Sequence, residues 1–163
     1  GVDGAKLEIL CSDTESAKKL SEFIQGSLTS TLDGMEVTVA AVPFNNRLER
    51  SRGGDFDMVV GGWTPVYADP VDFLNLLQTG NNGNDGNWSN AKYDQLIEDA
   101  HVTYANDIEK RWAAMQEADK IISEEAPLAS LYQISEAYLV NPDVKGLQFG
   151  PLGSIEYKYA SFK

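Results

Sequence analysis

The sequence predicts an α/β fold in which a central sheet is flanked by helices. The part of the chain up to Val60 contains three short apolar runs with strand character, separated by two helical patterns. This strand–helix–strand order is typical of α/β domains. The third run, Met58-Val59-Val60, is apolar without interruption, as expected for a central strand covered on both faces. At 163 residues the chain has the length of one ordinary domain.

The first strand and the first helix follow from local patterns. Lys6–Cys11 is predicted to be a strand. Ser12 is followed three residues later by Glu15, a capping box that predicts Ser12 as the N-cap of a helix. Asp33-Gly34 ends this helix in a turn. Its apolar positions are predicted to share one face, and they are Ala17, Leu20, Phe23, Ile24 and Leu28.

A second strand and a basic helix complete this half. Residues 35–41 place Met35, Val37, Val39 and Ala41 at alternate positions, so one face of the strand is more buried. Pro43 starts a predicted loop that contains Phe44 and Asn45. The short helix that follows carries Arg47, Arg50 and Arg52 and is stopped by Gly53-Gly54.

Helical patterns dominate the middle of the second half. After a loop over 64–70, residues 71–77 form an apolar helical stretch, and 80–89 form a polar Asn/Gly loop. Ser89 is predicted to cap a helix that carries Tyr93, Leu96, Ile97 and Ala100. The next helix is capped within residues 106–109 and ends at Pro127, and its predicted face consists of Ile108, Trp112, Met115, Ala118 and Ile122.

The last part of the chain alternates between β-like runs and Pro/Gly breaks. The runs lie at 128–135, 137–140, 146–149 and 155–160. No repeat, low-complexity tract or interdomain linker interrupts the sequence, so residues 1–163 are predicted to form a single domain.

Composition excludes several classes of function. The formal net charge is −12, which repels phosphate backbones and anionic lipid headgroups, so nucleic-acid binding is not expected. Cys11 is the single cysteine, so no intrachain disulfide or cysteine zinc cluster can form, and burial at a strand end is favoured over a reactive thiol. No apolar stretch approaches the length of a membrane span.

Sequence motifs also argue against catalysis and against a metal site. The chain has no Gly-x-Ser-x-Gly elbow and no phosphate-binding loop, and His101 is its only histidine. Asp57 and Asp69 could in principle form a glycosidase pair, but a chain with 25 acidic residues always offers such pairs. The loop from Asn81 hints at calcium, yet its twelfth position is Lys92 instead of glutamate. We therefore expect no catalytic residue, metal or cofactor.

Several motifs in register resemble the C-terminal lobe of family 5 solute-binding proteins, the receptors of oligopeptide, dipeptide and nickel ABC importers. Order and spacing hold from about Lys6 to Gly146. Each motif is weak alone, whereas together they are specific. The motifs are Gly54-Asp55-Phe56-Asp57, Gly62-Trp63, Tyr67-Ala68-Asp69-Pro70, Phe73-Leu74, Asn87-Trp88-Ser89-Asn90, Tyr93-Asp94, Leu96-Ile97, Glu124-Glu125-Ala126-Pro127, Leu131-Tyr132, Leu139-Val140 and Val144-Lys145-Gly146.

The resemblance implies a fold and a biological role. The fold would be one lobe of a periplasmic-binding-protein-like fold (type II, cluster C), with a mixed central sheet flanked by helices. Residues 1–163 would be the C-terminal lobe, excised from a longer two-lobed receptor that also carries the signal peptide and any membrane anchor. This receptor would be a monomeric, extracytoplasmic protein, either a cell-surface lipoprotein or a periplasmic protein. It would hold an extended oligopeptide between its lobes and deliver it to the membrane permease of an ABC importer.

Two alternatives remain open within this resemblance. The receptor could bind a non-peptide ligand, such as an oligosaccharide or a metal chelate. It could also be a signalling receptor for one peptide pheromone.

The same resemblance implies where a ligand would lie. The backbones of Gly62, Trp63 and Thr64 would form an edge on which an extended peptide adds as a strand, since main-chain groups are common to all peptides. Val66 and Tyr67 continue this segment. The alternative for Trp63 is a core tryptophan at a strand end.

One position departs from the family pattern. Several peptide receptors of the family carry an aspartate three residues after the tryptophan, where it pairs with the amino terminus of the ligand, and Val66 occupies that position here. Asp69 lies nearby in sequence and could substitute. Its position before Pro70 favours helix capping instead.

Phe44 and Asn45 are further ligand-binding candidates, because their loop follows a strand end. Ordinary loop packing explains them equally well. Arg47, Arg50 and Arg52 could meet a ligand carboxylate, although a solvated helix face is favoured for all three.

Overall fold

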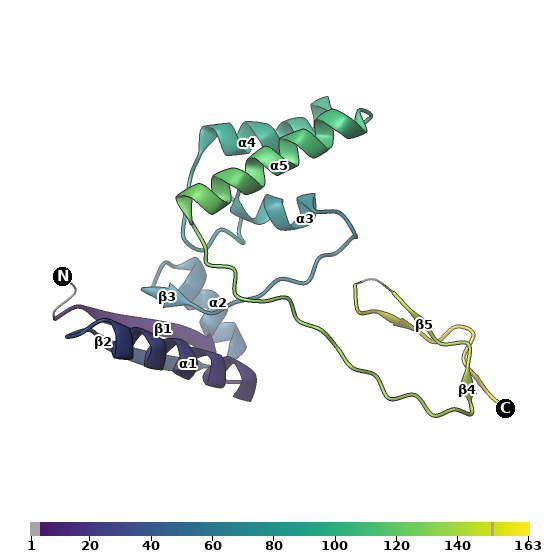
Figure 1. Ribbon diagram of the computed structural model, residues 1–163, viewed down its shortest axis with the longest axis horizontal. Coiled ribbons are helices and arrows are strands. Elements are labelled where there is room, and N and C mark those ends of the chain that lie inside the picture. Colours follow the sequence, from purple (N-terminus) through teal and green to yellow (C-terminus); the bar gives the residue numbers. More distant parts are fainter. Residues whose placement is uncertain (1–3, 151) are drawn as a thin grey trace. The chain divides into compact units, whose positions relative to one another are not determined.

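The fold is described by a computed structural model that covers residues 4–150 and 152–163 (Figure 1). Two compact units divide the chain. The first, called the sheet unit here, comprises the described residues up to Trp63 together with Thr79–Ser89. The second, called the helical unit, comprises Thr64–Gln78 and Asn90–Lys163.

A parallel three-stranded sheet forms the centre of the sheet unit, with the order β2-β1-β3. β1 (Lys6–Ser12) pairs with β2 (Glu36–Val42) over its whole length and with β3 (Met58–Val59) over two residues. Three consecutive residues of β1, Ile9, Leu10 and Cys11, are fully buried, so both faces of this strand are covered. The prediction that 58–60 is the central strand is therefore wrong for the described chain: β1 is central and β3 lies at an edge.

Helix α1 (Glu15–Thr31) follows β1 and packs on β1 and β2 (Figure 1). Its N-cap is Thr14, whose hydroxyl accepts from the Ala17 N–H, and the predicted cap at Ser12 is wrong. The reason is that Ser12 still pairs with Val42 in the sheet, so it cannot adopt a capping position. Phe23 is another correction, because it is exposed, whereas Ser21 is the buried residue of this helix.

Helix α2 (Phe44–Arg52) follows β2, with Pro43 as an N-cap that offers no side-chain hydrogen bond. Phe44 and Asn45 therefore lie in the first helical turn, not in the predicted loop. The buried residues of the helix are Arg47 and Ser51. Gly54 just beyond it has a φ of 72°, a backbone conformation that favours glycine.

The helical unit contains the helices α3, α4 and α5 and two short helical turns, η1 and η2. Their bounds are α3 (Val71–Leu74), the 3-10 turn η1 (Asn75–Leu77), α4 (Ala91–Glu98), the π-helical turn η2 (Asp99–Thr103) and α5 (Ile108–Glu125). Asn90 caps α4 by accepting from the N–H groups of Lys92 and Tyr93. The predicted cap, Ser89, instead accepts a hydrogen bond from the Thr79 hydroxyl at 3.0 Å.

Tyr93 lies in the core of the helical unit. It is fully buried, its hydroxyl donates to the Leu74 carbonyl at 2.5 Å, and burial raises the pKa of this phenol well above its ordinary value. The other buried apolar residues of this unit are Val71, Leu74, Leu77, Ile97, Ala100, Ala114, Met115, Ala118 and Ile121.

The face of α5 differs in part from the predicted one. Met115 and Ala118 are buried as expected, but Ile108 and Trp112 near the start of the helix are exposed. The helix ends at Ala126, which adopts a left-handed conformation with a φ of 48° and donates its N–H to Ile122.

Residues 127–163 are called the C-terminal arm here, and the strands in its described part, 127–150 and 152–163, are two residues long. Two antiparallel pairs form, β4 (Val144–Lys145) with β7 (Ser161–Phe162) and β5 (Gln148–Phe149) with β6 (Ile155–Glu156). The predicted runs at 128–135 and 137–140 are extended but pair with no strand among the described residues (Figure 1). The α/β prediction is confirmed, with parallel pairing in the main sheet and antiparallel pairing in the arm.

Gly146 has a local role within the arm. Its φ is 77°, and a Cβ at this position would collide with the Tyr159 carbonyl. Glycine is therefore required at this position of the Val144-Lys145-Gly146 motif.

Candidate functional site

The carboxyl edge of the parallel sheet brings together two of the predicted segments. β2 ends at Val42 and leads directly to Phe44 and Asn45, while β3 ends at Val59 and leads to Gly61-Gly62-Trp63. Both strands run parallel to β1, so these segments follow the strands at the same edge of the sheet. In α/β folds this edge is the usual position for ligands.

The backbone after β3 is open. The Val60 N–H donates to the Leu10 carbonyl at 2.9 Å. Among the described residues, no hydrogen bond engages the backbone of Gly61, Gly62 or Thr64. A Cβ on Gly62 would meet no atom within 4 Å, and its φ is not positive. Neither packing nor conformation thus requires glycine at 62, which leaves room for a second backbone.

Aromatic side chains flank this open segment. Trp63 is 48% exposed and Phe44 is 57% exposed, so Trp63 is not the core tryptophan of the alternative interpretation. Asn45, in the first turn of α2, is exposed as well. Large exposed aromatic residues beside free main-chain groups form a surface suited to an extended ligand.

The segment Thr64–Tyr67 belongs to the helical unit and is held from within that unit. The Val66 N–H donates to the Asp72 carboxylate at 2.8 Å, and Asp72 is itself buried. The Val66 side chain is 78% exposed, and Tyr67 is exposed. The backbone donor of Val66 is therefore occupied, whereas its side chain and those of Thr64 and Tyr67 face solvent.

The Asp69 carboxylate already binds groups of this chain, so it is not available to bind a ligand. Its carboxylate accepts the Val71 N–H at 3.0 Å and forms a two-point ion pair with Arg111, at 3.0 and 2.9 Å. The hydrogen bond from Arg111 lowers the pKa of Asp69. Arg111 also donates to the Ala100 carbonyl at 3.0 Å. Asp69 thus accepts the first N–H of α3, whose N-cap is Pro70 and not the predicted Asp69, and it ties the loop to α5.

The three arginines of α2 differ sharply. Arg50 pairs with Glu8 at 2.6 Å and Asp55 at 2.7 Å, and Arg52 is exposed. Arg47 is buried, so the predicted solvated face holds for Arg52 and not for Arg47. The sequence did contain a signal, because Arg47 lies on the same helical stripe as Leu48 and Ser51, the less polar positions of this helix.

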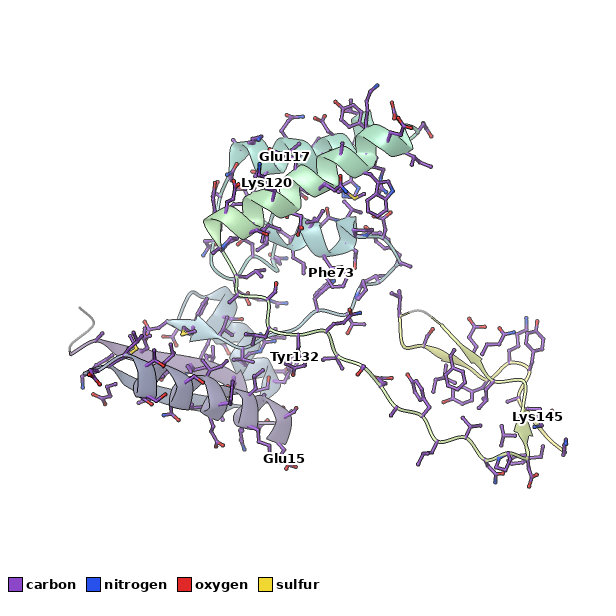
Figure 2. The ribbon with its side chains drawn as sticks, viewed as in Figure 1. Glu15, Phe73, Glu117, Lys120, Tyr132 and Lys145 are labelled. Atoms are coloured by element: carbon purple, nitrogen blue, oxygen red, sulfur yellow. The ribbon has the colours of Figure 1, made fainter. Side chains whose placement is uncertain are left out.

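A hollow of about 310 Å³ lies between α3 and α5 within the helical unit. It is largely apolar, and Phe73 from α3 (Figure 2) and Trp112 from α5 line its rim with their exposed rings. Among the predicted site residues, none lines this hollow.

Comparison with models of protein families shows which family this chain belongs to. The model for bacterial extracellular solute-binding proteins, family 5 Middle, matches residues 2–85, more than half of the chain. The chain belongs to this family. The family membership predicted from the sequence motifs is thereby confirmed.

Several proteins that the chain resembles are named for the peptides that they bind. A dipeptide-binding protein, DppE of Bacillus subtilis, is 36% identical over 143 residues, which cover 88% of this chain and 26% of DppE. Listeria monocytogenes OppA bound to peptide is 36% identical with a TM-score of 0.82, over 98% of this chain and 30% of OppA. The pheromone receptor PrgZ is 32% identical with a TM-score of 0.82, over 98% of this chain and 30% of PrgZ.

These relatives confirm the predicted periplasmic-binding-protein-like fold. The chain spans about a quarter of DppE and under a third of each solved receptor. Within the described residues, no helix has both the length and the apolar character that crossing a membrane requires.

Proposed function

We propose that this chain is the ligand-binding lobe of a longer extracytoplasmic receptor, which captures oligopeptides for an ABC importer. The receptor closes two lobes around an extended peptide and passes it to a membrane permease. Family membership and the names of DppE and OppA support this proposal.

The observation that carries the proposal is the open main chain after β3. Gly61 and Gly62 keep their backbone groups free of hydrogen bonds to described residues, at the carboxyl edge of the sheet. A peptide that adds here as a strand would be held by groups common to every peptide, whatever its sequence. Trp63 and Phe44 would contact its side chains.

The C-terminal arm supports the proposal that residues 1–163 are one lobe of a two-lobed receptor. Within the part of the arm that the structure describes, no large apolar side chain is buried, and Leu131, Ile134 and Leu139 are among the exposed ones. Tyr132 projects from the extended part of the arm (Figure 2). Such an apolar surface requires a covering partner in a stable protein. The arm makes up 37 of the 163 residues, so the match of 98% of the chain to peptide-bound OppA includes most of it.

The remaining properties follow from this role. The receptor binds and releases its ligand unchanged, so we propose no enzymatic activity, cofactor or resident metal. A net charge of −12 disfavours nucleic acid as a partner. We propose a monomer, located in the periplasm or held at the cell surface as a lipoprotein.

Native mass spectrometry of the full-length receptor tests the proposal. The receptor purified without added ligand should carry a ladder of peptide masses that dissociate on activation. A Gly62→Val variant should lose this ladder, because its side chain fills the space next to the open backbone. A single sugar or chelate mass would contradict the peptide assignment.

Gly86→Val is the matched control. Gly86 lies in an exposed loop of the same unit, and a Cβ there also meets no atom within 4 Å. It should keep the peptide ladder and the melting temperature of the wild type. If both variants kept the ladder, the Gly62 segment would not be the binding edge.

A second candidate function is reception of one peptide pheromone, since PrgZ matches 98% of the chain with a TM-score of 0.82. Mass spectrometry separates the two functions. One unique peptide mass in place of a ladder would favour the signalling receptor.

A further inference from the structure

Arg47 is a buried arginine that has no anionic partner among the described residues. Arg47 as a whole is only 8% exposed, and its Nε atom is buried and has no hydrogen-bond acceptor. No carboxylate of the described residues lies within 4.0 Å of it, whereas Arg50 and Arg111 each form close ion pairs. Arginine remains charged at every physiological pH, so this positive charge is always present.

The position of Arg47 is at the candidate binding edge. Its guanidinium lies over the Phe44 ring, 5.3 Å from the ring centre. One terminal nitrogen, Nη1, lies 3.6 Å from where a Cβ of Gly61 would be, directly beside the open backbone. Long helical side chains lean toward the start of their helix, which accounts for this placement.

A second feature adds positive potential at the same place. No side chain caps α2, so the N–H groups of its first turn, at Phe44, Asn45 and Asn46, have no side-chain acceptor. Because the chain as a whole carries a charge of −12, this attraction is local to the edge and is not a property of the whole surface.

A buried cation of this kind requires an anion, and the planar fork of a guanidinium matches a carboxylate in shape. We propose that Arg47 binds a carboxylate of the captured peptide, either its C-terminal group or an acidic side chain. This inference rests on the proposed function, because it takes a peptide to be the ligand. The rest of the receptor is the other possible source of a carboxylate, and the experiment below separates the two.

The test measures peptide affinity by calorimetry on the full-length receptor, freed of ligand by unfolding and refolding. Three probes share a free amino terminus: tetra-alanine, tetra-alanine carboxamide and Ala-Glu-Ala-Ala carboxamide. The variant is Arg47→Met, which keeps the length of the side chain without its charge. The matched control is Arg52→Met, an exposed arginine on the same helix. Melting temperatures confirm that both variants fold.

The wild type should bind at least one carboxylate-bearing probe about tenfold or more tightly than tetra-alanine carboxamide. Arg47→Met should bring all three affinities within about threefold of one another, and Arg52→Met should keep the wild-type preference. Binding of the carboxamide itself reports peptide capture independently of Arg47.

Three results would overturn the proposal. If Arg47→Met lowered the affinity of all three probes equally, Arg47 would stabilise the fold of the site without binding a carboxylate. If the wild type showed no preference and Arg47→Met lowered only the melting temperature, the carboxylate would belong to the receptor itself. If no probe bound at all, the peptide-binding function would fail together with the role of Arg47.

Discussion

The sheet unit and the C-terminal arm contain similar apolar, β-prone sequences but have very different structures. In the sheet unit, β1 pairs with β2 over seven residues and buries Ile9, Leu10 and Cys11 completely. In the arm, 128–140 is just as apolar in pattern, yet it pairs with no strand among the described residues. A strand forms where its partner strand and covering helix belong to the same chain. Under the proposed function, the partners of the arm would lie in the rest of the receptor.

The largest expected effect is in the sheet unit. Leu10→Ala should lower the free energy of unfolding of the 163-residue chain by about 2–5 kcal/mol, because it leaves a cavity in a fully buried strand. Leu139→Ala is the matched control: Leu139 is 105% exposed, and its loss should change stability by less than about 0.5 kcal/mol. Urea unfolding measures both. Equal losses would show that the arm packs against this chain after all.

Hydrogen exchange tests where the partners of the arm lie. In the 163-residue chain, the amides of 128–135 should exchange freely, since the described residues give them no hydrogen bond. In the full-length receptor the same amides should exchange at least about a hundredfold more slowly, once a partner strand protects them. Unchanged, rapid exchange in the full-length receptor would contradict the inference that the rest of the chain covers the arm.

The Asp69–Arg111 pair of the helical unit should have an intermediate effect. Asp69→Asn should lower the free energy of unfolding by about 1–3 kcal/mol, because Arg111 loses a partly buried anionic partner. The folded-state pKa of Asp69 is lowered, so its contribution is complete above the ordinary value near about 4 and is lost as the pH falls through the lowered value. Chemical unfolding between about pH 2 and 7 checks this. An unchanged acid dependence in Asp69→Asn would contradict it.

The smallest expected effect concerns one buried hydroxyl in the helical unit. Tyr93→Phe removes the hydrogen bond to the Leu74 carbonyl without a change in packing. It should lower the free energy of unfolding by about 0.5–1.5 kcal/mol, which thermal unfolding can detect. No measurable change would indicate that water satisfies the Leu74 carbonyl equally well in the variant.

The sequence alone determined the elements whose signals are local. It predicted β1, α1, β2, α2 and the helices of the second half, because the apolar period and the turn residues act within a few positions of each other. Cap positions were less certain, since a cap depends on where the preceding segment leaves its own structure. Ser12 illustrates this, because its pairing with Val42 shifted the cap to Thr14.

Only the tertiary structure decided which residues have partners. It showed that β1 and not 58–60 is the central strand and that Asp69 forms an ion pair with Arg111. It also showed that Arg47 is buried with no carboxylate of the described residues beside it. Each depends on residues far apart in the sequence, Asp69 and Arg111 being 42 positions apart. The apolar period of the sequence predicts which face of a helix or strand is buried. Which charged group contacts a buried side chain depends on how whole elements pack together.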